Sequence, residues 1–207
     1  MIINLIQTFS RIGLVTLALL FVWACPPPPN LNSNQSNANQ PGASAPRQAG
    51  ASGDVKFQPP AAWVSEPSTS SMRVAQYRLP RADGDAEDAS LILYYFGQGQ
   101  GGSTQANLDR WIGQMQQPGG GPSKEKAKTE KTTVNGMDVT LLDVSGTYTA
   151  EMTPGSGNQQ NKPGFRMRAA VIETPKGAYF VKLVGPEKTV ARWDAEFMSF
   201  VRSFEFK

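Results

Sequence analysis

The sequence contains no histidine and one cysteine among its 207 residues. The lack of histidine excludes serine–histidine and cysteine–histidine nucleophiles, imidazole acid–base catalysis and imidazole metal ligands. The single cysteine excludes an intramolecular disulfide framework and a thiolate metal site. The groups left to carry chemistry are carboxylates, lysines, tyrosines and the backbone, and no acid–base pair stands out among them. We therefore expect a protein that is not an enzyme and that has no cofactor and no metal.

The cysteine, Cys25, directly follows an apolar run at residues 12–24, and a basic residue precedes that run. This pattern is typical of a secretory signal peptide, which we place at residues 1–24. As a helix the run rises only ~20 Å, too little to cross a hydrocarbon core of roughly 30 Å. The pattern Val22-Trp23-Ala24-Cys25 resembles the lipobox of bacterial lipoproteins, although Trp23 stands where a small residue is usual. The resemblance implies a lipid on Cys25; the alternative is an ordinary signal peptide or an uncleaved anchor.

Residues 26–53 consist mainly of proline, asparagine, alanine, serine, glutamine and glycine. Such a composition cannot bury enough apolar surface to offset the entropy of ordering. We therefore predict that residues 25–53 are a lipidated cysteine followed by a disordered linker, which holds the rest of the protein off a membrane. Residues 54–207 have the length of a single domain with its own core.

The net charge of +3 changes its meaning once the chain is divided in this way. Arg11 and Arg47 lie in the leader and the linker, so the domain has 20 − 2 = 18 basic residues against 17 acidic ones. A nearly neutral domain gives no reason to expect nucleic acid as a partner. We expect instead a protein anchored by lipid to a membrane of the bacterial cell envelope, inner or outer, with an unidentified protein partner.

The pattern of apolar residues in the domain predicts a strand-rich structure. Residues 91–96 form an uninterrupted apolar run that suits a strand covered on both faces. Asn135-Gly136 marks the turn of a hairpin, because both residues tolerate positive φ. The expected strands are residues 55–57, 72–79 and 91–96, followed by hairpins that pair 126–134 with 137–148 and 165–174 with 178–184.

Two amphipathic helices are expected beside these strands. Ser103 can cap a helix whose apolar face carries Leu108, Trp111, Ile112 and Met115. Pro186 opens a last helix with a broad apolar stripe, formed by Val190, Trp193, Phe197, Val201 and Phe204. Core packing is the expected role of Trp63, Trp111 and Trp193. The fold class is thus α+β, a mostly antiparallel β-sheet packed with two amphipathic helices.

This order of elements resembles the Mog1/PsbP-like fold, an α/β/α sandwich, over nearly all of the domain. Three short stretches are also similar to an uncharacterised group of bacterial lipoproteins with that fold: Ser70-Ser71-Met72-Arg73, Tyr95-Phe96-Gly97 and Lys182-Leu183-Val184-Gly185-Pro186. Members of the fold include photosystem accessory proteins and a nuclear-transport binding protein. The resemblance therefore implies non-catalytic binding of other proteins, as an expectation from fold alone.

A glycine-rich segment at residues 97–102 has the letters of a dinucleotide-binding loop, G-x-G-x-x-G, between an apolar strand and a helix. The remaining context of such a site is missing, because no parallel strand ending in an acid follows the helix. We expect a flexible connection here. The alternative is a loop that contacts an anion, a small ligand or a partner through backbone amides at the helix start; its residues would be Gly97, Gly99, Gly101, Gly102 and Ser103.

Three further motifs have a structural and a functional interpretation. The acids Asp83, Asp85, Glu87 and Asp88 are crowded, but the spacing of a calcium loop is absent, so we expect a solvated turn. Residues 123–126 match S-x-x-K without the motifs that accompany it in penicillin-recognising enzymes. The lysines around it are expected to protect an exposed edge strand from pairing, with contact to anionic lipid as the alternative: Lys124, Lys126, Lys128 and Lys131.

A long polar loop is expected at residues 152–164, and loops of this length are either disordered or functional. It is the second candidate for a binding surface. The sequence thus predicts a membrane-anchored envelope protein with a binding or assembly-support domain. The alternative is a carrier of a small ligand or anion that uses residues 97–102 as the lip of its pocket, and an enzyme of unknown type is the third possibility.

Overall fold

The computed structural model describes residues 50–52, 54–151 and 155–207. Cys25, the predicted signal peptide and the predicted linker up to residue 49 lie outside these residues. Within the described part of the chain, no helix combines the length and the apolar character that crossing a membrane requires.

The main sheet has eight strands, and every pairing in it is antiparallel among the described residues. Its order is β3-β4-β5-β10-β9-β8-β6, with β7 also pairing with β8. The strands are β3 Val64–Glu66, β4 Arg73–Leu79, β5 Ala89–Tyr95, β6 Met115–Gln116, β7 Lys128–Val134, β8 Met137–Tyr148, β9 Lys162–Ile172 and β10 Tyr179–Pro186. The predicted mostly antiparallel α+β architecture is confirmed.

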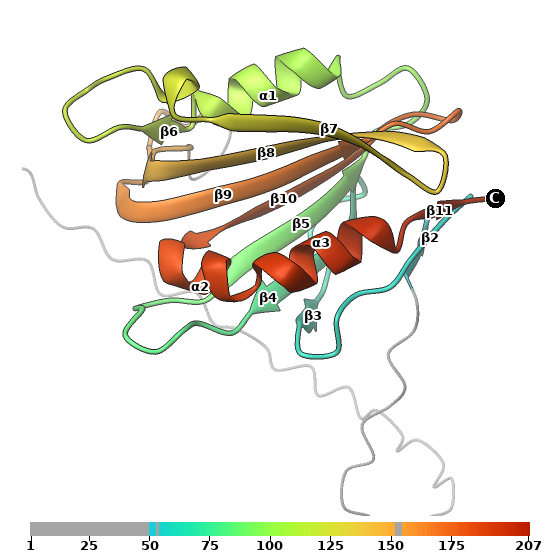
Figure 1. Cartoon of the computed structure of the whole chain (residues 1–207), viewed down its shortest axis with the longest axis horizontal. Coiled ribbons are helices and arrows are strands. Elements are labelled where there is room, and N and C mark those ends of the chain that lie inside the picture. Colours follow the sequence, from blue (N-terminus) through green and yellow to red (C-terminus); the bar gives the residue numbers. More distant parts are fainter. Residues whose placement is uncertain (1–49, 53, 152–154) are drawn as a thin grey trace, which may run out of the picture. The chain divides into compact units, whose positions relative to one another are not determined.

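Helices cover both faces of this sheet (Figure 1). Helix α1 (Thr104–Ile112) lies on one face, and α2 (Glu187–Arg192) and α3 (Asp194–Arg202) lie on the other. Each face has its own apolar cluster because side chains alternate along every strand. On β8, for example, Leu141 belongs to the cluster under α3, whereas Leu142 belongs to the cluster under α1.

The last helix departs from the prediction, because the chain forms α2 and α3 where one helix was expected. The break falls at Trp193, whose backbone (φ −98°, ψ 12°) leaves the helical range. Its indole Nε1–H donates to the carbonyl oxygen of Pro80 at 2.8 Å, which fixes the side chain on the β4–β5 connection. Phe204 lies beyond the end of α3, although it is fully buried as expected.

Other elements confirm or correct the expected boundaries. Asn135 (φ 48°) and Gly136 (φ 80°) form the turn between β7 and β8, as predicted. Met115 was expected on the first helix but lies in β6, where its buried side chain still joins the cluster under α1. The tryptophans Trp63, Trp111 and Trp193 are all buried, which confirms their role in the core.

A second, three-stranded sheet was not predicted. It joins β1 (Gly50–Ser52), β2 (Val55–Phe57) and β11 (Glu205–Phe206), so the two ends of the domain meet in one sheet. β2 was expected as a strand, whereas β1 falls in the predicted linker. Strand pairing therefore begins four residues before the predicted domain start at Asp54.

The predicted loop at residues 152–164 is shorter than expected. Lys162 and the two residues after it belong to β9, because the β8–β9 ladder continues to the pair Tyr148 and Lys162. An isolated bridge between Glu151 and Gln159 extends the pairing of the two segments further. Residues 152–154 lie outside the described part of the chain.

Candidate functional site

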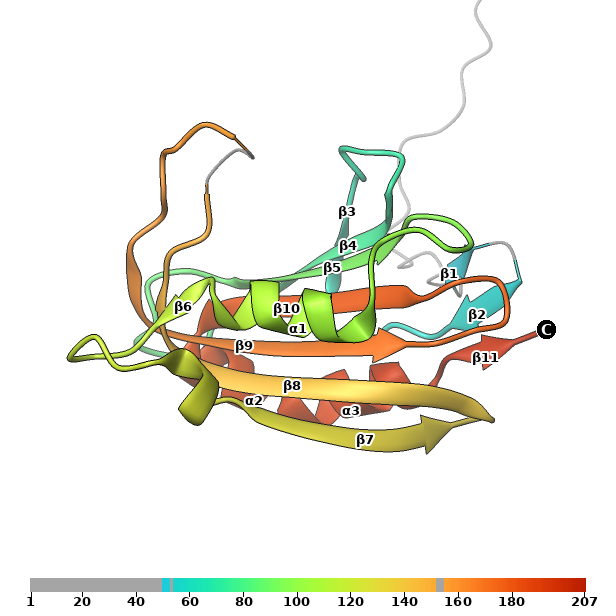
Figure 2. The same cartoon turned by 90° about the horizontal axis from the view of Figure 1, so that it is seen from above.

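A groove of about 840 Å³ lies on the α1 face of the sheet. Helix α1 has nine residues and rises about 14 Å, so it cannot cover a face built from eight strands. Its apolar side chains pack mainly over β8, β9 and β10. Figure 2 shows the β8–β9 connection and the β3–β4 end of the sheet extending past α1 on the same side. The groove is bounded by β4, β5, β10, α1 and the segments that flank this connection.

The floor of the groove comes from two adjacent central strands, β5 and β10. Their antiparallel register sets Lys182 beside Ile92 and Val184 beside Ser90. On its other side Lys182 pairs with Ala169 of β9. A lysine thus stands in the middle of a sheet face with apolar neighbours on both adjacent strands, a position where lysine is rare unless paired with a charge.

Lys182 has two polar partners, and neither is charged. Its Nζ donates to Gln114 Oε1 at 2.5 Å and to the Tyr148 hydroxyl at 3.2 Å, and it lies 5.1 Å from the centre of the Tyr148 ring. No carboxylate within the described residues forms an ion pair with it. Burial, with a further contribution from the positive charge of Arg110, lowers the pKa of Lys182 to about 7.

The acids that line the groove have hydrogen-bond or ion-pair partners other than Lys182. Glu87 pairs with Lys162 at 2.5 Å, and Asp88 pairs with Arg78 at 2.7 Å. The Glu151 carboxylate accepts a hydrogen bond from the backbone amide of Gly155 at 2.6 Å. The remaining positive charge of the groove therefore lies on three side chains for which the described residues provide no carboxylate partner: Arg73, Arg110 and Lys182.

The glycine-rich segment does not line this groove. Gly97, Gly99, Gly101 and Gly102 all have positive φ, between 71° and 101°. Gly101 lies against two rings of the apolar cluster, because a Cβ there would be 2.7 Å from Phe180 and 2.8 Å from Phe96. The segment is thus a turn that packs tightly at Gly101 and meets open space at Gly99. The alternative in which it forms the lip of a pocket does not match the groove. Its role as an anion or partner loop stays a prediction.

The start of α1 is satisfied by its own residues. The Ser103 hydroxyl accepts a hydrogen bond from the backbone N–H of Ala106 at 3.2 Å, which confirms the predicted cap. The buried Asn107 amide donates to the carbonyl oxygens of Gly101 and Ser103, at 2.8 and 2.9 Å, and so ties the segment to the helix. These bonds give residues 97–103 a structural explanation.

The acidic turn also resolves into separate contacts. Asp85 accepts hydrogen bonds from the backbone N–H and the hydroxyl of Thr189, at 2.9 and 2.6 Å, and thereby holds the start of α2. Glu87 pairs with Lys162 and Asp88 pairs with Arg78, so these carboxylates contact different partners and not one common site. Among the described residues, no three side chains of histidine, cysteine, aspartate or glutamate cluster closely enough to hold a metal ion.

The S-x-x-K motif at residues 123–126 begins in a 3₁₀ turn (Ser123–Glu125). The Ser123 hydroxyl donates to the Met115 carbonyl oxygen at 2.5 Å and accepts from the Gln117 amide at 3.2 Å, which is a structural role. β7, which carries Lys128 and Lys131, pairs with β8 alone and is almost entirely exposed. This matches the expectation that its lysines protect an edge strand.

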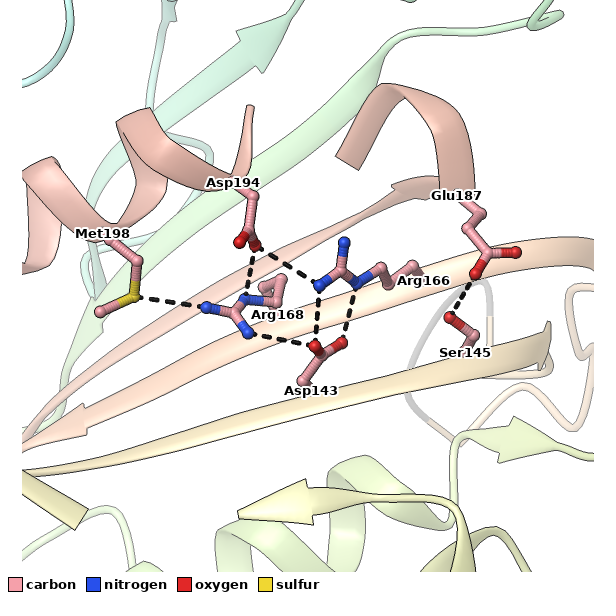
Figure 3. A network of polar contacts seen from close by, with 7 residues as sticks. All are labelled: Asp143, Ser145, Arg166, Arg168, Glu187, Asp194 and Met198. Atoms are coloured by element: carbon pink, nitrogen blue, oxygen red, sulfur yellow. Dashed lines mark hydrogen bonds and ion pairs between the residues drawn. The ribbon is translucent and has the colours of Figure 1, made fainter. Parts of the chain in front are cut away.

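A second cluster of charges lies on the opposite face of the sheet, under α3 (Figure 3). Asp143 accepts two hydrogen bonds from Arg166, at 2.8 and 2.7 Å, and one from Arg168 at 3.1 Å. Asp194 of α3 pairs with the same two arginines, at 3.5 and 3.0 Å. Burial acts to raise the pKa of Asp143, but hydrogen bonds and charge from the two arginines outweigh it and lower that pKa.

Sequence reasoning missed the residues that make the groove distinctive. Lys182 was noted only as part of a family-like stretch, and Arg110, Gln114 and Tyr148 were not singled out. One signal was present: Lys182 interrupts the apolar run of β10, whose neighbouring residues are buried. Its partners lie 68 and 34 residues away along the chain, so the constellation becomes visible only when the sheet is formed.

Comparison with known proteins gives matches in structure only. No protein-family model matches the sequence, and no curated protein matches it. Similar solved structures include the cyanobacterial PsbP protein CyanoP from Synechocystis, with a TM-score of 0.47 and 12% identity over 82% of this chain and 98% of that one. Another is LpqN, involved in cell envelope biogenesis of Mycobacterium tuberculosis, with a TM-score of 0.44 and 11% identity over 74% of this chain and 83% of that one.

A third similar structure is a Pseudomonas aeruginosa protein of unknown function, with a TM-score of 0.38 and 14% identity over 62% of this chain and 78% of that one. A PsbP protein is thus among the solved structures to which this chain is similar.

Proposed function

We propose that this protein is a lipid-anchored component of a bacterial cell envelope and that its domain is a non-catalytic binding module whose binding surface is the groove. The observation that carries the proposal is Lys182, which lies on the floor of a groove of about 840 Å³ and has no carboxylate partner in the described part of the chain. Pockets of roughly 300–1,000 Å³ with a few convergent polar groups are typical of ligand sites.

The groove favours a ligand over a broad protein interface. Among the described residues, the most exposed large apolar side chains are Val64 at 40% and Met72 at 50%. Two such residues do not form the apolar patch of several hundred Å² that marks a stable protein–protein contact. The carrier alternative therefore gains support, with its site moved from the glycine-rich segment to the groove.

The proposal that the domain is not an enzyme rests on the sequence, which has no histidine. In the groove, Lys182 is held by a neutral amide and a phenol, and burial raises the pKa of that phenol, Tyr148, to about 12. Tyr148 is therefore a poor general base at neutral pH, whereas Lys182, with its pKa of about 7, is the group on which a catalytic role of the groove would depend.

The anchor is supported by the leader and by Cys25, which lie outside the described residues. A thioether-linked diacylglycerol together with an amide-linked chain gives the two-signal anchoring that holds a protein stably on a membrane. We expect Cys25→Ala to shift the protein from the membrane fraction to the soluble fraction of the cell. A wild-type protein with an unmodified cysteine and an intact leader, found by mass spectrometry, would exclude the lipid anchor.

Binding through the groove can be tested by photo-crosslinking of the full chain in its native cell. A photoreactive residue at Gln159, which is exposed and lines the groove, should yield a specific adduct with a ligand or partner. The same residue at Lys131, exposed on the edge strand β7, is the matched control and should yield none. Adducts at Lys131 alone would reject the groove as the binding surface.

A further inference from the structure

We propose that the groove binds a single-chain amphiphile with an anionic head, a carboxylate or a phosphate monoester, whose head lies between Lys182 and Arg110 and whose tail lies along Ile92 and Val184. This inference rests on the proposed function, in which the groove is the binding surface. It adds the chemical class of the ligand.

The need for an anion follows from the two cations. Arg110 of α1 contributes to the field at Lys182, although Arg110 itself is exposed. An ammonium has three donors, and Gln114 and Tyr148 accept from Lys182, so one donor remains. The Arg110 guanidinium donates to Asn107 Oδ1, which leaves most of its five donors free for a head group. An anion between these cations would replace their repulsion with two charge-assisted hydrogen bonds.

The apolar part of the ligand follows from the floor. Ile92 of β5 and Val184 of β10 are only half-buried on the floor, whereas Phe180 is covered by the cluster under α1. Tyr94 and Phe96 stack with ring centres 5.9 Å apart and continue this half-buried surface toward the end of β5. Covering such carbon surface gains roughly 25 cal/mol per Å². The half-buried apolar side chains that line the groove are Ile92, Tyr94, Phe96, Tyr148 and Val184.

The carboxylates at the groove argue against a polyanion. Glu87, Asp88 and Glu151 also line it, and a nucleic acid strand or a polyphosphate would bring further negative charge close to them. Lys182 on the floor and Arg110 on α1, with three acids in the lining, fit one small anionic head. The tail can then occupy the apolar part of the groove.

The test uses Trp111, which lines the groove, as a contact sensor in the full lipidated protein held in nonionic detergent. The probe is 10-bromodecanoate, because bromine quenches tryptophan fluorescence on contact. We expect saturable quenching that is absent from Trp111→Phe, the control that removes the signal. A brominated decyl maltoside should quench much less, and acetate should not compete. A second probe, bromodecyl phosphate, shows by comparison whether the groove prefers a phosphate or a carboxylate head. Saturable quenching by either probe supports an anionic single-chain amphiphile as the ligand.

The substitution Lys182→Met should weaken the binding of bromodecanoate at least tenfold, and Lys182→Arg should restore most of it. Arg110→Gln changes an exposed residue and should weaken the binding of bromodecanoate several-fold. It replaces Lys182→Met as the test variant if Lys182→Met does not fold. Equal binding of the neutral probe, or unchanged binding in both variants, would overturn the anionic amphiphile. If no brominated probe binds while Gln159 still forms adducts, the anionic amphiphile is rejected and the groove remains the proposed binding surface. If the Gln159 adducts are also missing, the groove is rejected as the binding surface as well.

Discussion

The two faces of the sheet hold charged clusters of opposite character. Under α3, two arginines and two aspartates form a network in which the charges cancel (Figure 3). On the α1 face, Lys182 lies near Arg110, and its partners are a neutral amide and a phenol. The first cluster joins β8, β9 and α3, whereas the second lies open to a groove. A balanced network has a structural explanation, whereas an unbalanced one either releases a proton or takes a counter-charge from outside.

The largest effect is expected when the balanced network is broken. Asp143→Asn leaves Arg166 and Arg168, whose side chains are 17% and 13% exposed, with one of their two shared carboxylates, Asp194. Removing one partner of a buried ion pair costs about 3–5 kcal/mol, and partial exposure places this case near 3 kcal/mol. Urea-induced unfolding measures the loss. Asp109→Asn is the control, because its ion pair with Lys124 is exposed and long at 3.7 Å; it should change stability by under about 0.5 kcal/mol.

This network also fixes a dependence on pH. The folded-state pKa of Asp143 lies below its ordinary value of 3.8, so the stability that it contributes is present above that value. It is lost as the pH falls further, through the folded-state pKa. Wild type should therefore lose more stability than Asp143→Asn on acidification below about pH 4. Parallel acid-unfolding curves for the two proteins would show that the network makes no such contribution.

A smaller effect on stability is expected from substitutions in the glycine-rich segment. These substitutions test whether the segment has a structural role or belongs to the binding surface. Gly101→Ala places a methyl group against Phe180 and Phe96 at positive φ, and should cost about 2–3 kcal/mol. Gly99→Ala meets open space at φ 71° and should cost only about 1 kcal/mol. Thermal or urea unfolding measures both. Neither NAD nor a nucleoside triphosphate should bind, and loss of Gln159 adducts in a folded Gly99→Ala protein would assign the segment to the binding surface.

Local patterns predicted the parts of the fold that local chemistry determines. The Asn135-Gly136 turn was predictable because both residues accept the positive φ that the structure shows. The break at Trp193 was not predictable, since the apolar spacing continues through it and the Pro80 carbonyl that its side chain contacts is distant in the sequence. Met115 was misplaced because a helix or a strand at that position buries the same side chain.

The candidate site was less predictable than the fold. The electrostatic character of the groove is set by the charged side chains that lack a partner in the described structure. Which side chains these are is determined by the register between the strands and by how far α1 extends over the sheet. The sequence contains the motif letters at residues 97–102, which draw attention to a turn that the structure explains by packing. It contains no such signal for Gln114 and Tyr148, whose roles arise from contact with Lys182.

The most direct test of the unbalanced cluster, with an effect close to that of Gly99→Ala, is the response of stability to pH at Lys182. Its pKa of about 7 lies below the value of 10.5 expected in the unfolded chain. Between these values the unfolded state binds a proton that the folded state does not, so stability should rise with pH across this interval. Because the Lys182 side chain is only half-buried, solvent screening reduces the effect on the free energy of unfolding to about 1–2 kcal/mol, less than the full pKa shift would give. Lys182→Met should remove this rise and be more stable than wild type at pH 7 without ligand, whereas exposed Lys188→Met should behave as wild type. Identical pH profiles for wild type and Lys182→Met would mean that the Lys182 charge is already compensated.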